Sequence, residues 1–152
     1  MSLSVALAER RRLPPHRRLV PLLAVGIARL LARAKPARLR TVLEFTRRGA
    51  VPATADQALA AREAVVSVSL RCAGQGCLQR SIATALLCRT RGVWPTWCTG
   101  VRTHPFAAHA WVEADDHPIG EPHPKGHFKP LISIPPLQRD EAADGRARAA
   151  GR

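Results

Sequence analysis

The stretch that decides the fold covers residues 77–92 and reads CLQRSIATALLCRTRG. Its apolar residues recur at a spacing that predicts an amphipathic helix; they are Leu78, Ile82, Ala85 and Leu86. Arg89 and Arg91 lie where the last turn is expected, and Gly92 follows as a helix terminator. Cys77 therefore begins the predicted helix. Its thiol faces unpaired backbone N–H groups and the positive end of the helix macrodipole, and both lower the pKa of a thiol.

Downstream of this helix the sequence predicts an antiparallel sheet. Residues 93–101 and 108–113 are apolar and rich in strand-forming side chains, and residues 102–107 form the loop between them. We expect Asp115 and Asp116 in a turn, with residues 117–121 returning as a third, short strand before a proline-rich segment. The predicted fold class is therefore α+β, a cysteine-bearing helix packed on a small antiparallel sheet.

Further helices are predicted upstream. Residues 19–45 carry apolar side chains at helical spacing, and Pro36 divides the stretch into two helices. Thr54 and Gln57 form a capping-box pattern that opens another helix, which runs toward Leu70. We divide the chain into a basic N-terminal helical region at 1–52, a core domain at 53–137 and a disordered tail at 138–152.

The N-terminal segment also imitates a secretory signal peptide, because arginines within residues 10–18 precede an apolar run at 19–31 and an Ala-Arg-Ala sequence. Arg29 limits the uninterrupted apolar run to about ten residues, well below the roughly 20 that cross a bilayer. We therefore expect an amphipathic helix, no integral membrane span and a cytoplasmic protein.

Composition excludes some classes of partner. Of the 152 residues, 46% are hydrophobic, enough to build the core of one domain. Lys and Arg total 24 against 11 Asp and Glu, a formal charge of +13, but the basic residues are scattered along the chain. Aromatic residues make up only 4%, too few for the stacking surfaces that bind single-stranded nucleic acid. We expect no nucleic-acid partner.

The cysteines and histidines argue against a metal site. The four cysteines, at 72, 77, 88 and 98, contain no CxxC pair, and the histidines are irregularly spaced. Structural zinc sites use closely spaced ligand pairs, so we expect no metal, no cofactor and reduced thiols. A non-enzymatic basic or metal-binding module is the alternative, which metal and DNA-binding assays would test.

Chain geometry brings three reactive side chains to one end of the domain. A helix of about 14 residues rises roughly 21 Å, and a strand of about seven residues returns roughly 23 Å. His109, at the start of the next strand, is therefore level with Cys77. If residues 114–116 form a three-residue loop, Glu113 pairs with His117 and Glu121 lies opposite His109.

A converging thiol, imidazole and carboxylate have the arrangement of a thiol protease. Cys77, His109 and Glu121 are therefore the catalytic candidates. The structural alternatives are a small buried thiol, a packed and hydrogen-bonded histidine, and a solvated carboxylate. The residues expected to bind substrate or support the site are Gln75, a candidate oxyanion donor; Arg80 and Ser81, which share the helix face of Cys77; and Trp111, in the strand of His109. A structural ion pair is an equal alternative for Arg80, and an ordinary loop position for Gln75.

Four strings of the sequence carry a family resemblance: Cys77-Leu-Gln-Arg-Ser-Ile-Ala-Thr-Ala-Leu-Leu, Gly100-Val-Arg, Pro105-Phe and His109-Ala-Trp-Val-Glu. Together they resemble the stand-alone leader peptidases of lasso-peptide biosynthesis. These are transglutaminase-like, papain-like cysteine proteases. The resemblance implies that Cys77 is the nucleophile and His109 the general base. The family usually has an Asp on the following strand, where this sequence has Glu121. Asp115 and Asp116 are the other candidates for the residue that orients His109.

The resemblance also implies a reaction and partners. Such a peptidase cuts a ribosomal precursor between leader and core, after a residue that a Thr precedes. A separate leader-recognition protein presents the leader region, and an ATP-dependent lasso cyclase closes the freed core. A transglutaminase-like acyl transfer by the same Cys–His pair is the closest enzymatic alternative.

Overall fold

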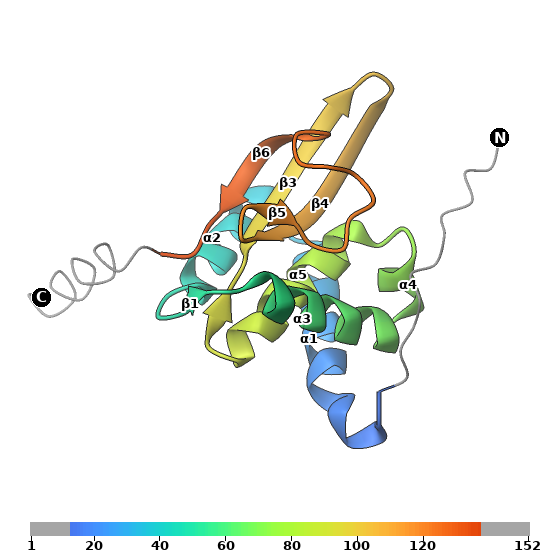
Figure 1. Ribbon diagram of the computed structural model, residues 1–152, viewed down its shortest axis with the longest axis vertical. Coiled ribbons are helices and arrows are strands. Elements are labelled where there is room, and N and C mark those ends of the chain that lie inside the picture. Colours follow the sequence, from blue (N-terminus) through green and yellow to red (C-terminus); the bar gives the residue numbers. More distant parts are fainter. Residues whose placement is uncertain (1–12, 138–152) are drawn as a thin grey trace, which may run out of the picture.

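The computed structural model describes residues 13–137, which form a group of helices against a small sheet (Figure 1). The elements run in the order η1 (Pro15–Arg17), α1 (Leu19–Leu31), α2 (Pro36–Thr46), β1 (Val51–Pro52), α3 (Ala55–Val68), α4 (Leu70–Ala73), α5 (Cys77–Thr90), β2 (Val93–Trp94), β3 (Thr96–Thr103), β4 (Phe106–Ala114), β5 (His117–Pro118) and β6 (Lys129–Ile134). The predicted α+β class is confirmed. The predicted tail at 138–152 lies outside the described residues.

The helices follow the sequence pattern closely. Helices α1 and α2 are separated before Pro36, as predicted. Both capping-box hydrogen bonds at the start of α3 are present: the Gln57 backbone N–H donates to Thr54 Oγ1 at 3.3 Å, and Thr54 N–H donates to Gln57 Oε1 at 3.0 Å. However, α3 ends at Val68, before Leu70, because Ser69 accepts the Cys72 N–H at 3.3 Å and caps a new short helix.

The main sheet has four antiparallel strands in the order β5-β4-β3-β6. The expected strand 93–101 is divided at Pro95. Strand β3 continues two residues past the predicted end, to Thr103, and β4 begins two residues early, at Phe106, so only residues 104 and 105 join them. Strand β6 was not predicted, because its segment is rich in proline. Among the described strands it pairs with β3 alone, and such an edge strand tolerates Pro130.

The turn from β4 to β5 corrects the predicted register. Asp115 and Asp116 have φ angles of 48° and 66°, a left-handed pair that makes a two-residue hairpin turn. Ala114 therefore pairs with His117, and Glu113 pairs with Pro118 rather than with His117. Strand β5 ends there and does not reach Glu121.

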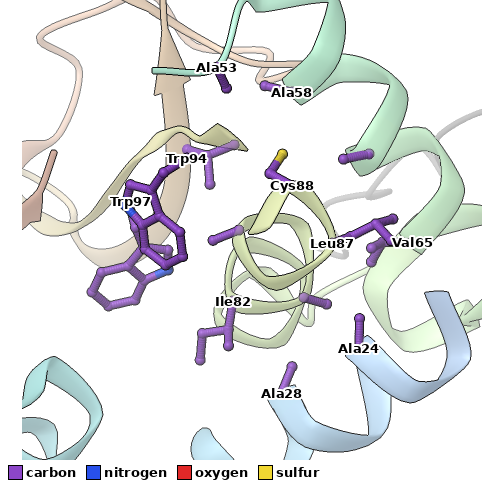
Figure 2. Packing of buried hydrophobic residues seen from close by; sticks show 14 of the residues in the cluster. Ala24, Ala28, Ala53, Ala58, Val65, Ile82, Leu87, Cys88, Trp94 and Trp97 are labelled. Carbon is purple, nitrogen blue, oxygen red and sulfur yellow. The ribbon is translucent and has the colours of Figure 1, made fainter. Parts of the chain in front are cut away.

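Helix α5 lies at the centre of the core. Figure 2 shows it between Trp94 and Trp97 on one side and helices α1 and α3 on the other. Ala24 and Ala28 of α1 are buried against it, since small side chains let helices approach closely. Between residues 13 and 137 there is no helix long and apolar enough to cross a membrane.

Candidate active site

A tight turn places Cys77 at the first residue of α5. The Gly76 N–H donates to the Arg71 carbonyl at 2.9 Å, and a Cβ on Gly76 would lie 2.6 Å from that oxygen, so only glycine fits. Gly76 is also the N-cap and offers no side-chain acceptor. The first-turn N–H groups of Leu78 and Gln79 therefore receive no side-chain cap at the end of the helix that carries the half-buried thiol.

His109 of β4 is the base that the structure places beside this thiol. Its neighbour across the sheet is Gly100. A Cβ on Gly100 would lie 2.3 Å from the Lys129 carbonyl oxygen, so a larger residue at this position would clash with the backbone of β6. Burial raises the pKa of Cys77, but the His109 imidazole, the Ala110 backbone N–H and nearby positive charge outweigh it and lower that pKa below its ordinary value. Burial lowers the pKa of His109, but hydrogen bonds and charges from Cys77 and Glu121 raise it to about 9. Both shifts are in the direction that favours a thiolate–imidazolium pair.

Glu121 completes the group of three. Its Oε2 accepts a hydrogen bond from His109 Nε2 at 2.7 Å, and its side chain is only 5% exposed. This leaves Nδ1 of the imidazole for the thiol. The predicted contact is therefore present, although the predicted hairpin register is wrong. The chain turns at Gly120, which has a φ of 63°, and this turn directs Glu121 toward His109.

Two arginines surround the other oxygen of Glu121. Arg80 Nη2 lies 3.6 Å from Glu121 Oε1, and Arg62 Nη2 lies 3.9 Å from it. Arg80 Nη1 also donates to the carbonyls of Cys72 and Gly74, at 3.0 and 3.1 Å, so it stabilises the turn that precedes the nucleophile. Arg80 is thus ion-paired, and because its partner is the residue that contacts His109, the ion pair also supports the site.

Sequence reasoning missed Arg62. It comes from α3, 59 positions before Glu121, and its side chain is 12% exposed. Its Nε is buried without a hydrogen-bond partner among the described residues. Gly120 makes room for it, since a Cβ there would lie 2.9 Å from the Arg62 side chain. In the sequence nothing marks Arg62 among the many arginines.

The turn carboxylates have other partners. Asp115 Oδ2 accepts the Ala55 N–H at 2.7 Å and so attaches the turn to the start of α3. Asp116 pairs with Lys125 on the surface. Of the three acidic candidates, only Glu121 has a described contact with His109.

Two other predicted residues have structural contacts near the nucleophile. Gln75 is exposed, and its carbonyl, rather than its amide side chain, contacts the nucleophile residue by accepting the Cys77 N–H at 3.0 Å. Ser81 is 3% exposed; it donates to the Leu78 carbonyl at 2.9 Å and accepts the Trp97 Nε1–H at 3.0 Å. Ser81 is therefore too buried to contact a leader peptide, because α5 turns this face toward the sheet.

Trp111 lies two residues along β4 from His109, on the same face of the strand. The two rings are stacked, with centroids 6.0 Å apart, and the indole N–H donates to Glu113 at 2.8 Å. Phe128, which the sequence did not identify, stacks on His109 with centroids 4.9 Å apart. The imidazole is thus held by aromatic rings as well as by Glu121.

The other thiols lack these surroundings. Cys72, Cys88 and Cys98 are free and buried, and burial raises their pKa values, to about 11 for Cys88 and Cys98. Within the range 13–137, no group of three or more His, Cys, Asp or Glu side chains is arranged to hold a metal ion.

The geometry agrees with a comparison to known families. The model of the Transglutaminase-like superfamily matches residues 21–133, which is most of the chain. The protein therefore belongs to this superfamily, which includes cysteine peptidases and acyl transferases. No curated protein and no solved structure gave a match.

Proposed function

We propose that the protein is a cysteine peptidase that removes the leader from a ribosomally made lasso-peptide precursor. The observation that carries the peptidase assignment is the contact of Glu121 with His109 beside a thiol of lowered pKa. The choice of substrate rests on the resemblance of residues 77–87 and 109–113 to lasso leader peptidases. A separate leader-recognition protein and an ATP-dependent lasso cyclase are the proposed partners, and the cytoplasm is the proposed compartment.

Acylation uses the thiolate and the imidazolium together. The Cys77 thiolate attacks the carbonyl carbon of the scissile bond, and the carbonyl oxygen takes the negative charge. The uncapped N–H groups at the start of α5 are the proposed donors to that developing charge. The imidazolium then gives its proton to the leaving amine, the C–N bond breaks, and the leader remains on Cys77 as a thioester.

Hydrolysis reverses the proton transfer. Neutral His109 removes a proton from water, the resulting oxygen nucleophile attacks the thioester, and the C–S bond breaks to regenerate the thiolate. Glu121 accepts the Nε2–H throughout, so the imidazole keeps the tautomer and orientation that present Nδ1 to the reacting atoms.

The direct test is cleavage of a lasso precursor peptide, followed by mass spectrometry, with and without the leader-recognition protein encoded beside it. We expect slow cleavage by the isolated chain at low micromolar precursor and a strong increase with the partner, because tethering raises the effective concentration of the leader. Equal rates would show that this chain binds the leader directly. Absence of any Cys77-dependent cleavage would reject the peptidase assignment.

Acyl transfer is the second candidate, favoured by the superfamily match. The two activities share the thioester and differ only in whether water or an amine resolves it. Addition of a primary amine to the cleavage reaction distinguishes them. A transferase gives mainly the amide product, whereas a peptidase gives mainly the free acid.

A further inference from the structure

A cavity of about 170 Å³ lies on the side of His109 formed by β4 and the segment between β5 and β6. That segment arches beside β4 in Figure 1. Rings form most of the cavity wall: those of His109, Trp111, His123 and Phe128, together with three prolines, Pro118, Pro124 and Pro130. Cys77 does not line the cavity, so a substrate that reacts at the thiol would extend past the imidazole to enter it.

The size of the cavity suits a single side chain. An engineered apolar cavity of about 150 Å³ in another protein accommodates benzene, so this volume matches a Leu, Met or Phe side chain rather than a folded segment. Because Trp111 and Phe128 form an aromatic wall, an apolar group gains contact along its whole length.

The charged groups around the cavity already have partners. Glu113 accepts the Trp111 N–H, Glu121 accepts from His109, and Lys125 pairs with Asp116. An acidic substrate side chain would lose water without gaining a free counter-charge, because Lys125 is paired with Asp116. The cavity therefore favours an apolar group over an acidic one.

The position of His109 gives the direction of the substrate. In the proposed reaction the imidazolium protonates the leaving amine, so the leaving segment lies on the imidazole side of the thiol. An extended peptide advances about 3.3 Å per residue, and the cavity touches the imidazole itself. Only the first one or two leaving residues can place a side chain there.

We propose that this cavity is a subsite for one apolar side chain of the first or second residue after the scissile bond. The proposal rests on the proposed function, since it takes the direction of the substrate from the protonation of the leaving amine. It assigns to the start of the core peptide a part in selecting the cleavage site, in addition to the leader.

Nucleophile competition tests the subsite without knowledge of the natural precursor. The acyl donor is an N-acetylated dipeptide p-nitrophenyl ester with Thr before its last residue; Cys77 displaces p-nitrophenolate and forms a thioester. Water then competes with an added dipeptide amide for this thioester. When the dipeptide reacts, its amine nitrogen forms the new C–N bond, the C–S bond breaks, and the amine proton passes to His109. The ratio of amide to acid product measures binding on the leaving side.

The added amines are Gly-Gly, Leu-Gly, Gly-Leu and Gly-Asp amides. We expect Leu-Gly or Gly-Leu amide to partition about ten-fold or more better than Gly-Gly amide, the effect typical of an apolar group in a fitted pocket. Gly-Asp amide should be no better than Gly-Gly amide. Because every ratio comes from one acyl-enzyme, it does not depend on how fast that acyl-enzyme forms.

Phe128→Ala removes one wall of the cavity and should bring the Leu preference close to one. Phe106→Ala is the matched control: Phe106 is 75% exposed, does not line the cavity, and the variant should keep the preference. Leu, Gly and Asp amides that partition equally in an enzyme with Cys77-dependent ester turnover would overturn the subsite alone. Absence of Cys77-dependent p-nitrophenolate release would overturn the proposed function instead.

Discussion

Cys77 and Cys88 stand near the two ends of the same helix, and their surroundings make them chemically different. Cys77 lies at the N-terminus of α5, where an imidazole and a backbone N–H lower its pKa. Cys88 is 0% exposed, packs in the core near the C-terminal end, and has its pKa raised to about 11 by burial (Figure 2). The helix macrodipole adds to this difference, because its positive end favours a thiolate at Cys77 and its negative end disfavours one near Cys88. The groups around a thiol therefore decide whether it is a nucleophile. The following predictions test this difference between Cys77 and Cys88.

The largest expected effect is loss of leader cleavage in Cys77→Ala, because the thioester cannot form. Cys88→Ala should keep at least about a tenth of the rate and instead lower the free energy of unfolding by about 1 kcal/mol, the usual cost of a small core deletion. Cleavage assays and urea unfolding of both variants separate the two roles. Cys72→Ala and Cys98→Ala serve as further controls. Full activity in Cys77→Ala would remove the basis of the assignment.

Selective alkylation is the next largest effect. At neutral pH iodoacetamide should modify Cys77 about a hundred-fold or more faster than Cys88, since the thiolate is the reactive form and burial keeps Cys88 protonated. Mass-spectrometric mapping of the native protein over time gives the order. Faster labelling of Cys88 or Cys98 would contradict the assignment of Cys77 as the reactive thiol.

The carboxylate of Glu121 is part of what distinguishes the Cys77 end. Glu121→Gln should slow single-turnover cleavage by roughly ten- to a thousand-fold, less than the about 10⁴-fold typical when a triad acid is neutralised. Glu121→Asp should retain measurable activity. Asp115→Asn and Asp116→Asn, at the turn, should be near neutral. A dead turn variant beside a normal Glu121→Gln would show that the orienting acid is at the turn.

The pH profile should follow the two shifted groups. Activity requires a thiolate and an imidazolium, so it should rise through the lowered pKa of Cys77 and fall as the pH passes about 9, where His109 loses its proton. Glu121→Gln removes the charge that raises the pKa of His109 and leaves a weaker, neutral acceptor for Nε2–H, so the basic limb of kcat/KM should move about one unit lower. An unmoved limb would mean that Glu121 does not act on the imidazole.

The smallest effect is expected at Arg62, which acts only through Glu121. Arg62→Gln should lower kcat/KM by about three- to ten-fold, within the range for one weakened charged contact, and Arg62→Lys should restore part of the loss. Gly120→Ala should act in the same direction, because its Cβ displaces the Arg62 side chain. Arg38→Gln, at an exposed position on α2, is the matched control. Equal values for the Arg62 and Arg38 variants would separate Arg62 from the site.

Local patterns in the sequence predicted much of the site. Apolar periodicity and Gly92 delimited the helix that begins at Cys77, and the Thr54–Gln57 capping box marked the start of α3. The superfamily match confirms the coarse family that the cysteine and histidine strings indicated. The two helix starts depend on residues that lie within one or two helical turns of each other, where backbone geometry allows few alternative structures.

The contact of the Glu121 carboxylate with His109 was predicted correctly, but the hairpin register that was expected to produce it was wrong. A three-residue hairpin loop would place Glu121 directly across from His109. The two-residue turn through Asp115 and Asp116 shifts the register by one residue, and the turn at Gly120 brings Glu121 back to the same imidazole. Turn length depends on the φ angles that two aspartates adopt, and Asp115 is held by a hydrogen bond from α3 that no local pattern shows.

By itself, the sequence determined a cysteine at the start of a helix, a histidine in a following strand and their placement at one end of an α+β domain. Only the tertiary structure decided that Arg62 and Arg80 meet at Glu121, that Phe128 stacks on His109 and that a cavity opens beside it. The physical reason is range. Helix starts and strands arise from neighbours along the chain, whereas buried ion pairs and cavities arise where elements distant in sequence exclude water together.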